Sequence, residues 1–152
     1  MTVIVQRIDR ASVIADGEQS GRAARGMLLL IGVRAGDSED ICDRMADKIA
    51  KMRIFEDENG KMNLSLSDVG GEVLAVSNFT LCGSCRRGNR PDFFGAERPE
   101  AANALYLRFV ERLRACGIHT ETGVFGADMK ISAELCGPVT LIVDSDRDLA
   151  KR

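Results

Sequence analysis

One uninterrupted apolar segment near the start of the chain limits the folds that the chain can adopt. Residues 27–33 (Met-Leu-Leu-Leu-Ile-Gly-Val) contain no polar side chain. A segment this short is typical of a strand buried on both faces, which lies inside a sheet and is covered on each side. It is far shorter than the ~20 apolar residues that a membrane-spanning helix needs. We therefore expect a globular protein built around a central strand, with no membrane span.

Strand patterns also precede and follow this segment. Residues 3–8 and 11–15 predict one long or bent strand, and Asp16-Gly17 predicts a hairpin turn into a return strand at 18–24. Further strand patterns occur at 54–55, 62–66, 72–79, 118–122, 129–135 and 139–143.

Two segments have apolar residues at helical spacing. In the first, Ile41, Met45 and Ile49 recur every fourth residue after Asp37 or Ser38, either of which can cap a helix. The second begins at a proline, ends at a glycine and carries a longer apolar stripe. Its residues are Pro99, Ala102, Leu105, Tyr106, Phe109, Leu113, Cys116 and Gly117.

The order of these elements predicts the fold class. Runs of strands separated by two helices favour an α+β fold with mixed or antiparallel sheets and two flanking helices. No repeat, linker or composition break divides the sequence, so residues 1–152 are expected to form a single domain. The charged tail, residues 145–152, is expected to be frayed.

The charge balance excludes a nucleic-acid-binding coat over the whole surface. Lys plus Arg number 21 and Asp plus Glu 23, so the net charge is -2. Any RNA contact must use a local patch, for which Arg86, Arg87 and Arg90 in a glycine-bearing loop are the candidates. The same loop is also compatible with an ordinary solvated segment. Phe93 and Phe94 beside it either anchor the loop or stack on a base.

The five cysteines do not match a metal site or a disulfide framework. Their number is odd, and the first residues lack a signal-peptide pattern, so a cytoplasmic location is expected. Cys82 and Cys85 form a C-x-x-C pair, but its flanks are typical of a loop, and His119 is the one histidine. We expect structural or incidental thiols, no metal and no cofactor.

The strand pattern at 73–76 turns polar at its end. Ser77, Asn78, Phe79 and Thr80 follow four apolar residues. Polar groups at the end of a buried strand must be hydrogen-bonded or face a cleft. They either satisfy the nearby backbone, or form a small site whose hydroxyl, amide and backbone N–H groups suit ester cleavage.

Other candidate site residues lie far away in the sequence. Gly137-Pro138 falls between two strand patterns and indicates a turn or a sheet edge, although a fixed Gly-Pro could also present bare carbonyl oxygens to a ligand. Arg7 lies among apolar residues and needs a partner for its charge, in an ion pair or at a site. A Ser-His-Asp triad is not expected, because His119 has no accompanying G-x-S-x-G segment.

Several longer motifs, in one order and over nearly the whole chain, resemble the D-aminoacyl-tRNA deacylase family of the bacterial and eukaryotic type. They are Q-R at 6–7, A-S-V at 11–13, R-I-F-E-D at 53–57, G-K-M-N-L-S-L at 60–66, S-N-F-T-L at 77–81, F-G-A-D-M at 125–129 and G-P-V-T at 137–140. The resemblance implies a homodimer that hydrolyses the ester between a D-amino acid, or glycine, and the 3′-terminal adenosine of tRNA.

The resemblance also implies roles for the candidate residues. Thr80 would be the nucleophile, unless the 2′-hydroxyl of the RNA is the activating group, and Ser77, Asn78 and Phe79 would line the site with it. The backbone N–H groups of Phe79 and Thr80 would lie near the scissile ester. Phe125 would shape the pocket that holds the adenosine or the amino acid.

Met129 would shape the same pocket. Gly137-Pro138 would be a cis pair that reaches into the partner subunit's site, captures the substrate amino group with its carbonyls and rejects L-amino acids sterically. Arg7 would hold that pair in place.

The sequence departs from the family pattern at two places. Asn78 stands where the family usually has glutamine, and Leu135 and Cys136 stand where it usually has Asn and a small polar residue. Two alternatives therefore stay open: a related tRNA-editing deacylase with relaxed chirality, and a non-catalytic dimeric tRNA-binding module. Ser77 and Phe79 favour the D-specific deacylase.

Overall fold

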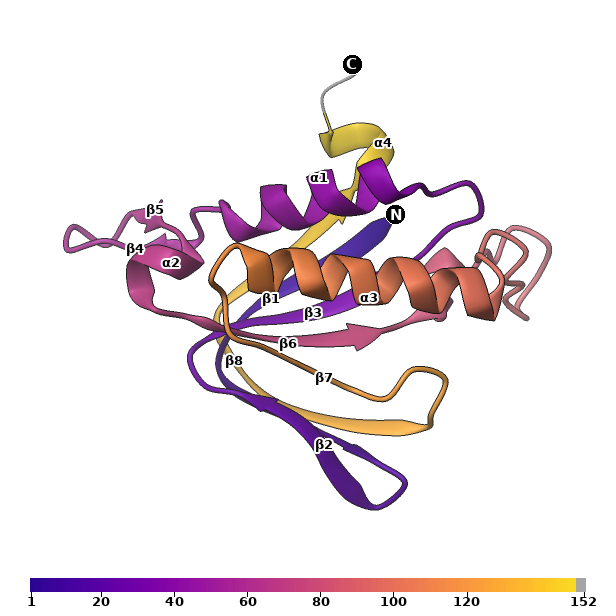
Figure 1. Cartoon of the computed structure of the whole chain (residues 1–152), viewed down its shortest axis with the longest axis horizontal. Helices are drawn as coiled ribbons and strands as arrows, with labels where there is room; N and C mark the ends of the chain where they lie inside the picture. The colour runs from indigo at the N-terminus through magenta and orange to yellow at the C-terminus, as the bar shows by residue number, and fades with distance from the viewer. Residues whose placement is uncertain (150–152) are drawn as a thin grey trace.

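A computed structural model describes residues 1–149. The elements are β1 (Thr2–Ala15), β2 (Glu18–Ala23), β3 (Gly26–Gly32), α1 (Glu39–Ala50), β4 (Phe55–Glu56), β5 (Met62–Leu64), α2 (Leu66–Val69), β6 (Glu72–Ser77), the 3-10 helix η1 (Phe79–Cys82), α3 (Pro99–Ala115), β7 (Thr120–Thr122), β8 (Met129–Asp144) and α4 (Ser145–Asp148). The α+β class is confirmed (Figure 1). No helix in residues 1–149 is long and apolar enough to cross a membrane.

The main sheet is mixed, as expected. Its strand order is β2-β1-β3-β6-β7, and β8 pairs with β1. The pairs of β1 with β2, β3 and β8 are antiparallel, whereas β3·β6 and β6·β7 are parallel. The apolar run at 27–33 therefore supplies the central strand β3, flanked by β1 and β6.

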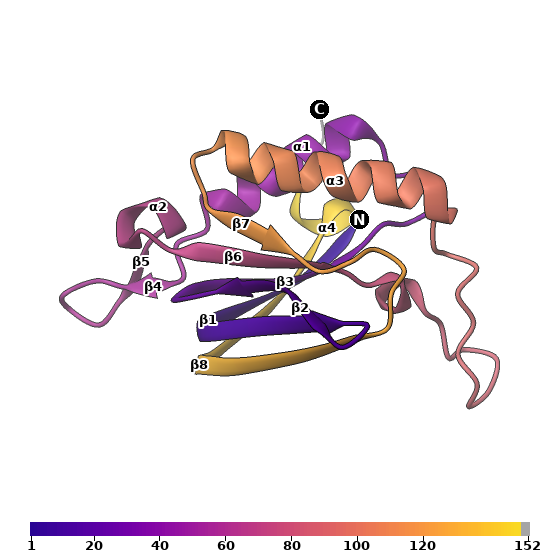
Figure 2. The ribbon, with the colours of Figure 1, turned by 60° about the horizontal axis from the view of Figure 1, so that its bottom comes forward.

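Both faces of β3 are covered by apolar side chains. Met27, Leu29 and Ile31 belong to a core shared with α1 and α3, and Leu28 belongs to a second core with Ile8. Figure 2 shows the two long helices on one side of β3 and β6, while β2 and part of β1 and β8, which belong to the same sheet, lie on the other. Burial on both faces explains why β3 lacks the polar alternation of a half-exposed strand.

The helices begin where the sequence predicts. The Ser38 side chain caps α1 by accepting a hydrogen bond from the Ile41 N–H, and Pro99 is the first residue of α3. Across the helix pair, Arg108 contacts Asp43 at 2.7 Å and Arg112 contacts Asp47 at 2.6 Å. These guanidinium groups lower the pKa of both carboxyls, with the hydrogen bonds as the largest cause.

Three expectations about element boundaries were wrong. The expected strand at 72–79 ends at Ser77, because η1 begins at Phe79. The expected strand at 62–66 ends at Leu64, because the Ser65 side chain caps α2. The two strands expected around Gly137-Pro138 are one strand, β8, which continues along β1 with irregular register at this point.

The expectation of a frayed tail was also wrong for residues 145–148, which form α4. Ser145 is buried, and its N–H donates to the Met1 carbonyl at 2.9 Å. The Thr2 hydroxyl donates to the Asp144 carboxylate at 3.0 Å. These contacts attach the end of β8 to the start of β1. The rest of the expected tail, residues 150–152, lies outside the described residues.

Candidate active site

A cavity of about 570 Å³ opens at the end of β6. It is lined by the ends of β3 and β6, the start of η1, residues around the start of α3, and the turn that leads into β8. The lining residues are Leu30, Val33, Val76, Ser77, Asn78, Phe79, Thr80, Ala96, Glu97, Pro99, Ala102, Phe125, Gly126, Ala127, Asp128, Met129 and Ile131. Six candidate residues therefore line one cavity. They come from two segments, 77–80 and 125–129, which are 45 positions apart in the sequence.

The backbone leaves β6 for η1 at Asn78. The Asn78 N–H still donates to the Ile31 carbonyl of β3 at 2.8 Å, so the strand pairing is kept up to this residue. Its side-chain oxygen then caps η1, accepting from the Thr80 N–H at 3.2 Å and from the Thr80 hydroxyl at 2.5 Å. Gly32 permits this close turn, because a Cβ there would lie 2.9 Å from the Leu81 Cβ.

These bonds decide which groups remain available to a ligand. The Thr80 hydroxyl and N–H are both engaged by Asn78, and an amide oxygen is too weak a base to remove a proton from the hydroxyl. The Ser77 hydroxyl and the Phe79 N–H, in contrast, have no hydrogen-bond partner within residues 1–149. The family resemblance implies one role for the Phe79 and Thr80 N–H groups, whereas among the residues that the structure describes only the Phe79 N–H is free.

The opposite wall is apolar. The Phe125 ring packs 6.1 Å from that of Tyr106, centroid to centroid, and the buried Tyr106 hydroxyl donates to the Ala75 carbonyl at 2.9 Å. Burial raises the pKa of Tyr106 to about 12, so this hydroxyl stays protonated. Gly123 leaves space for Met129, because a Cβ at Gly123 would lie 2.6 Å from its sulfur.

Titratable side chains are scarce in the cavity wall. Glu97 and Asp128 are the only two among its lining residues. Asp128 lies within the F-G-A-D-M motif but was not named as a site residue. Sequence reasoning also missed Ala96, Glu97, Pro99 and Ala102, because nothing in the sequence indicates that the start of α3 lies beside the end of β6. His119 is not in the wall; its Nε2 lies 3.4 Å from the Glu121 carboxylate.

The structure does not bring Gly137, Pro138 or Arg7 to this cavity. Gly137 lies eight residues beyond Met129 on β8, roughly 25 Å along the strand. Gly137 and Pro138 are exposed, and the bond between them is cis. Arg7 is buried and supports this segment, donating to the carbonyls of Ile54 at 2.8 Å and Cys136 at 3.3 Å.

The C-x-x-C pair has no structural sign of metal or redox chemistry. Cys82 is half-buried, its thiol donates to the Val33 carbonyl at 3.4 Å, and burial raises its pKa. Cys85 is exposed. Within residues 1–149, no three His, Cys, Asp or Glu side chains are grouped so that they could hold a metal ion.

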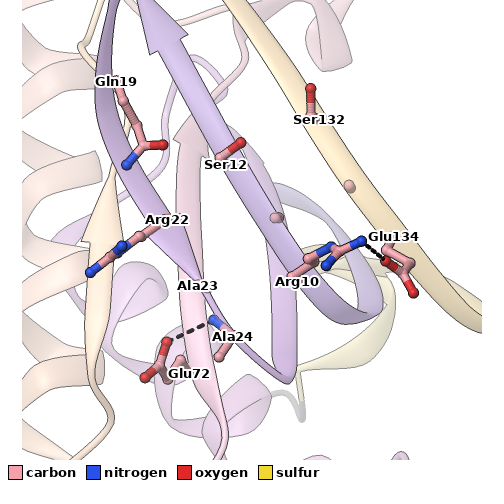
Figure 3. Close-up of a pocket in the computed structure, with 11 residues that line it drawn as sticks. Arg10, Ser12, Gln19, Arg22, Ala23, Ala24, Glu72, Ser132 and Glu134 are labelled. Atoms are coloured by element: carbon pink, nitrogen blue, oxygen red, sulfur yellow. Dashed lines mark hydrogen bonds and ion pairs between the residues drawn. The ribbon is translucent and has the colours of Figure 1, made fainter.

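A second, shallower groove of about 770 Å³ lies over β1, β2 and β8. Three of its four charged side chains have partners: Arg10 pairs with Glu134 at 2.8 Å, and Glu72 accepts from the Ala24 N–H at 2.7 Å (Figure 3). None of the site residues expected from the sequence lies in it. The cavity at the end of β6 is therefore the better candidate for an active site.

Comparison with known proteins identifies the family of this chain. A family profile described as D-Tyr-tRNA(Tyr) deacylase matches residues 4–144, which include every residue of the S-N-F-T segment and of Gly-Pro. The chain belongs to the D-Tyr-tRNA(Tyr) deacylase family. The match runs from the third residue of β1 to the last residue of β8 and so covers nearly the whole main sheet.

Individual members of the D-Tyr-tRNA(Tyr) deacylase family are similar over nearly their full length. A D-aminoacyl-tRNA deacylase from Paracoccus denitrificans is 52% identical, covering 95% of this chain and 97% of the relative. One from Koribacter versatilis is 53% identical, covering 97% and 99%.

Two solved structures share the fold. One, named c-Myc DNA unwinding element binding protein, has a TM-score of 0.88 and 38% identity, covering 95% of this chain and 98% of its own. The other, described as a probable eukaryotic D-amino acid tRNA deacylase, has a TM-score of 0.81 and covers 94% and 99%. At 19% identity, the second likeness concerns the fold alone.

Proposed function

We propose that this protein is a D-aminoacyl-tRNA deacylase, which hydrolyses the ester between a D-amino acid, or glycine, and the 3′-terminal adenosine of tRNA. The observation that carries the proposal is the cavity in which the S-N-F-T segment faces Phe125 and Met129. Family membership and close relatives named as D-aminoacyl-tRNA deacylases support the choice of substrate.

The proposed mechanism uses the substrate's own 2′-hydroxyl to activate a water molecule, which attacks the ester carbonyl carbon. The bond to the 3′ oxygen then breaks, that oxygen takes up a proton, and the amino acid is released. Within residues 1–149, the cavity wall contains no histidine. The Thr80 hydroxyl donates a hydrogen bond to the Asn78 amide oxygen, which is too weak a base to deprotonate it, so Thr80 is a weak nucleophile. The free Phe79 N–H is suited to stabilise the negative charge that develops on the ester oxygen. Thr80 and Asn78 would hold that N–H in position and contact the substrate.

We further propose that two copies form a homodimer through β8. This strand of 16 residues pairs with β1 alone among the described strands, so its other edge is free. It exposes large apolar side chains: Ile131 (39%), Leu135 (46%), Leu141 (39%) and Ile142 (57%). A long apolar edge strand of this kind is a ready template for pairing with another chain.

In this dimer, Gly137-Pro138 of one protomer would complete the site of its partner. The separation of Gly137 from the cavity of its own chain supports that role. The Gly-Pro carbonyls would hold the substrate amino group, and their backbone would exclude an L side chain. Arg7 would fix the segment through the Cys136 carbonyl.

Mixing two inactive variants tests the shared site. Asn78→Ala disables the cavity of its own chain by removing the cap of η1. Gly137→Ala disables the contribution to the partner, because a Cβ there would lie 2.8 Å from the Val139 nitrogen and 3.0 Å from the Arg7 guanidinium. After subunit exchange, half of the dimers are mixed and have one intact site each, so roughly a quarter of wild-type activity should return. Two variants that stay inactive after verified exchange would refute a shared site.

Single-turnover deacylation of matched D-Tyr-, L-Tyr- and Gly-tRNA tests the function itself. We expect rapid loss of the D-tyrosyl and glycyl esters, with the L-tyrosyl ester retained. Hydrolysis of the L ester at a similar rate would instead identify a deacylase with relaxed chirality. Tight tRNA binding with all three esters intact would identify a non-catalytic binding module, an alternative to which the DNA-binding name of one similar structure adds weight.

A further inference from the structure

The loop 83–95 begins and ends at the rim of the cavity. Phe79 and Thr80 line the cavity just before the loop, and Ala96 and Glu97 line it just after. Between these points the chain projects away from the sheet and the helices (Figure 2). If the last nucleotide of an RNA strand occupies the cavity, the preceding nucleotides can therefore lie along this loop.

The base of the loop is fixed to the active-site segment. Ser84 and Asp92 exchange backbone hydrogen bonds of 2.8 and 2.9 Å, which closes the loop. The Phe93 ring lies edge-on to that of Phe79, with centroids 5.1 Å apart. Gly83 leaves room for Phe93, because a Cβ there would lie 2.9 Å from the ring. Phe93 is thus an anchor, one of the two roles that the sequence left open.

The outer part of the loop offers unpaired cations and a free aromatic ring. Arg86, Arg87 and Arg90 are exposed, and none forms an ion pair with a residue in 1–149. Phe94 is 86% exposed, directly beside the anchored Phe93. In a chain of net charge -2, three unpaired arginines on one short loop form a local anion-binding surface.

We propose that the loop 83–95 binds the single-stranded RNA immediately before the esterified nucleotide. Arg86, Arg87 and Arg90 contact its phosphates, and Phe94 stacks on one of its bases. Cations along a backbone together with an exposed aromatic ring are the combination that recognises single-stranded nucleic acid with little sequence preference. This inference rests on the proposed function, since it assigns the RNA portion of that substrate to a surface.

The test compares two substrates that share the scissile ester but differ in length. One is D-Tyr-tRNA, and the other is 3′-O-(D-tyrosyl)adenosine, which has no preceding nucleotides. In the variant R86Q/R87Q/R90Q, we expect kcat/KM for the tRNA substrate to fall about tenfold or more, mainly through KM. Activity on the short ester should stay within twofold. The slope of log KM against log salt concentration should fall by about 2, since each single-strand phosphate contact contributes about 0.7.

Phe94→Ala tests stacking separately. Loss of one stacked base should raise KM for D-Tyr-tRNA about tenfold, with the short ester unaffected. Leu107→Ala is the matched control, because Leu107 is a half-exposed apolar residue on α3 outside the cavity wall. For the arginines the control is K48Q/K51Q/K61Q, which removes the same charge from exposed positions on α1, its C-terminal end and the β4–β5 turn.

The outcomes separate this inference from the proposed function. If the wild-type protein hydrolyses neither substrate, the function fails. If it hydrolyses both, and the arginine variant keeps full kcat/KM and an unchanged salt slope on D-Tyr-tRNA, the loop does not bind RNA. An equal loss on both substrates would also overturn the inference, because the loop would then act on the geometry of η1 rather than on the RNA.

Discussion

Asn78→Ala is expected to lower the single-turnover rate of D-Tyr-tRNA deacylation about 100-fold. The Asn78 side-chain oxygen accepts hydrogen bonds from both the hydroxyl and the N–H of Thr80. Removing this oxygen therefore leaves the first turn of η1 without its cap. Loss of one preorganised donor at a developing oxyanion costs about 10²–10³ in rate, and Asn78→Ala would disturb the Phe79 N–H and Thr80 together. The free energy of unfolding should fall only by the ~0.5–2 kcal/mol of a lost helix cap.

A second variant distinguishes positioning from direct chemistry. Asn78→Gln, the residue that the family usually has here, keeps a neutral amide oxygen as acceptor without adding a charge or a base, and should recover most of the rate. Asn63→Ala is the matched control, because Asn63 lies on β5 outside the cavity wall and bonds to Asp57 at 3.4 Å. If Asn78→Ala deacylates within threefold of wild type, the cap is not needed for catalysis.

Phe109→Ala is expected to lower the free energy of unfolding by about 3–5 kcal/mol. Phe109 is fully buried on α3, in the core that joins α3 to α1 and the sheet. Truncating it removes the buried ring and leaves a cavity that close-packed neighbours fill only in part. For a chain of this size the midpoint of thermal unfolding should fall by about 6–20 °C.

Thermal unfolding at one fixed protein concentration gives the measurement, because dimerisation would make the midpoint depend on concentration. Leu107→Ala, on the same helix but half-exposed, should change the free energy of unfolding by no more than about 0.5 kcal/mol. Equal midpoints for the two variants would contradict the assignment of Phe109 to the core.

The sequence predicted well the features that depend on neighbouring residues. The apolar run at 27–33 predicted the central strand, Ser38 and Pro99 predicted the helix starts, and Asp16-Gly17 predicted a hairpin turn. Each depends on local periodicity, on capping or on backbone conformation; Asp16 and Gly17, for example, both adopt positive φ. The motif resemblance likewise named six residues that line the cavity, namely Ser77, Asn78, Phe79, Thr80, Phe125 and Met129.

Local pattern could not supply the boundaries that distant contacts set. Gly137-Pro138 was expected to separate two strands, but pairing with β1 on both sides of it keeps β8 continuous. The tail was expected to fray because it is charged, but the contact of Ser145 with Met1 orders it. In both cases, hydrogen bonds to residues more than 100 positions away outweigh the local preference.

The sequence alone determined the central strand, the two long helices, the family resemblance and the chemical groups available for ester hydrolysis, because these follow from residue type and spacing. Only the tertiary structure decided that Thr80 is held by Asn78 while the Phe79 N–H stays free, that Gly137 lies far from the cavity of its own chain, and that Phe93 anchors a loop on which Phe94 stays exposed. Each of these features depends on contacts between groups in space, and the packing of the sheet and helices determines which contacts form.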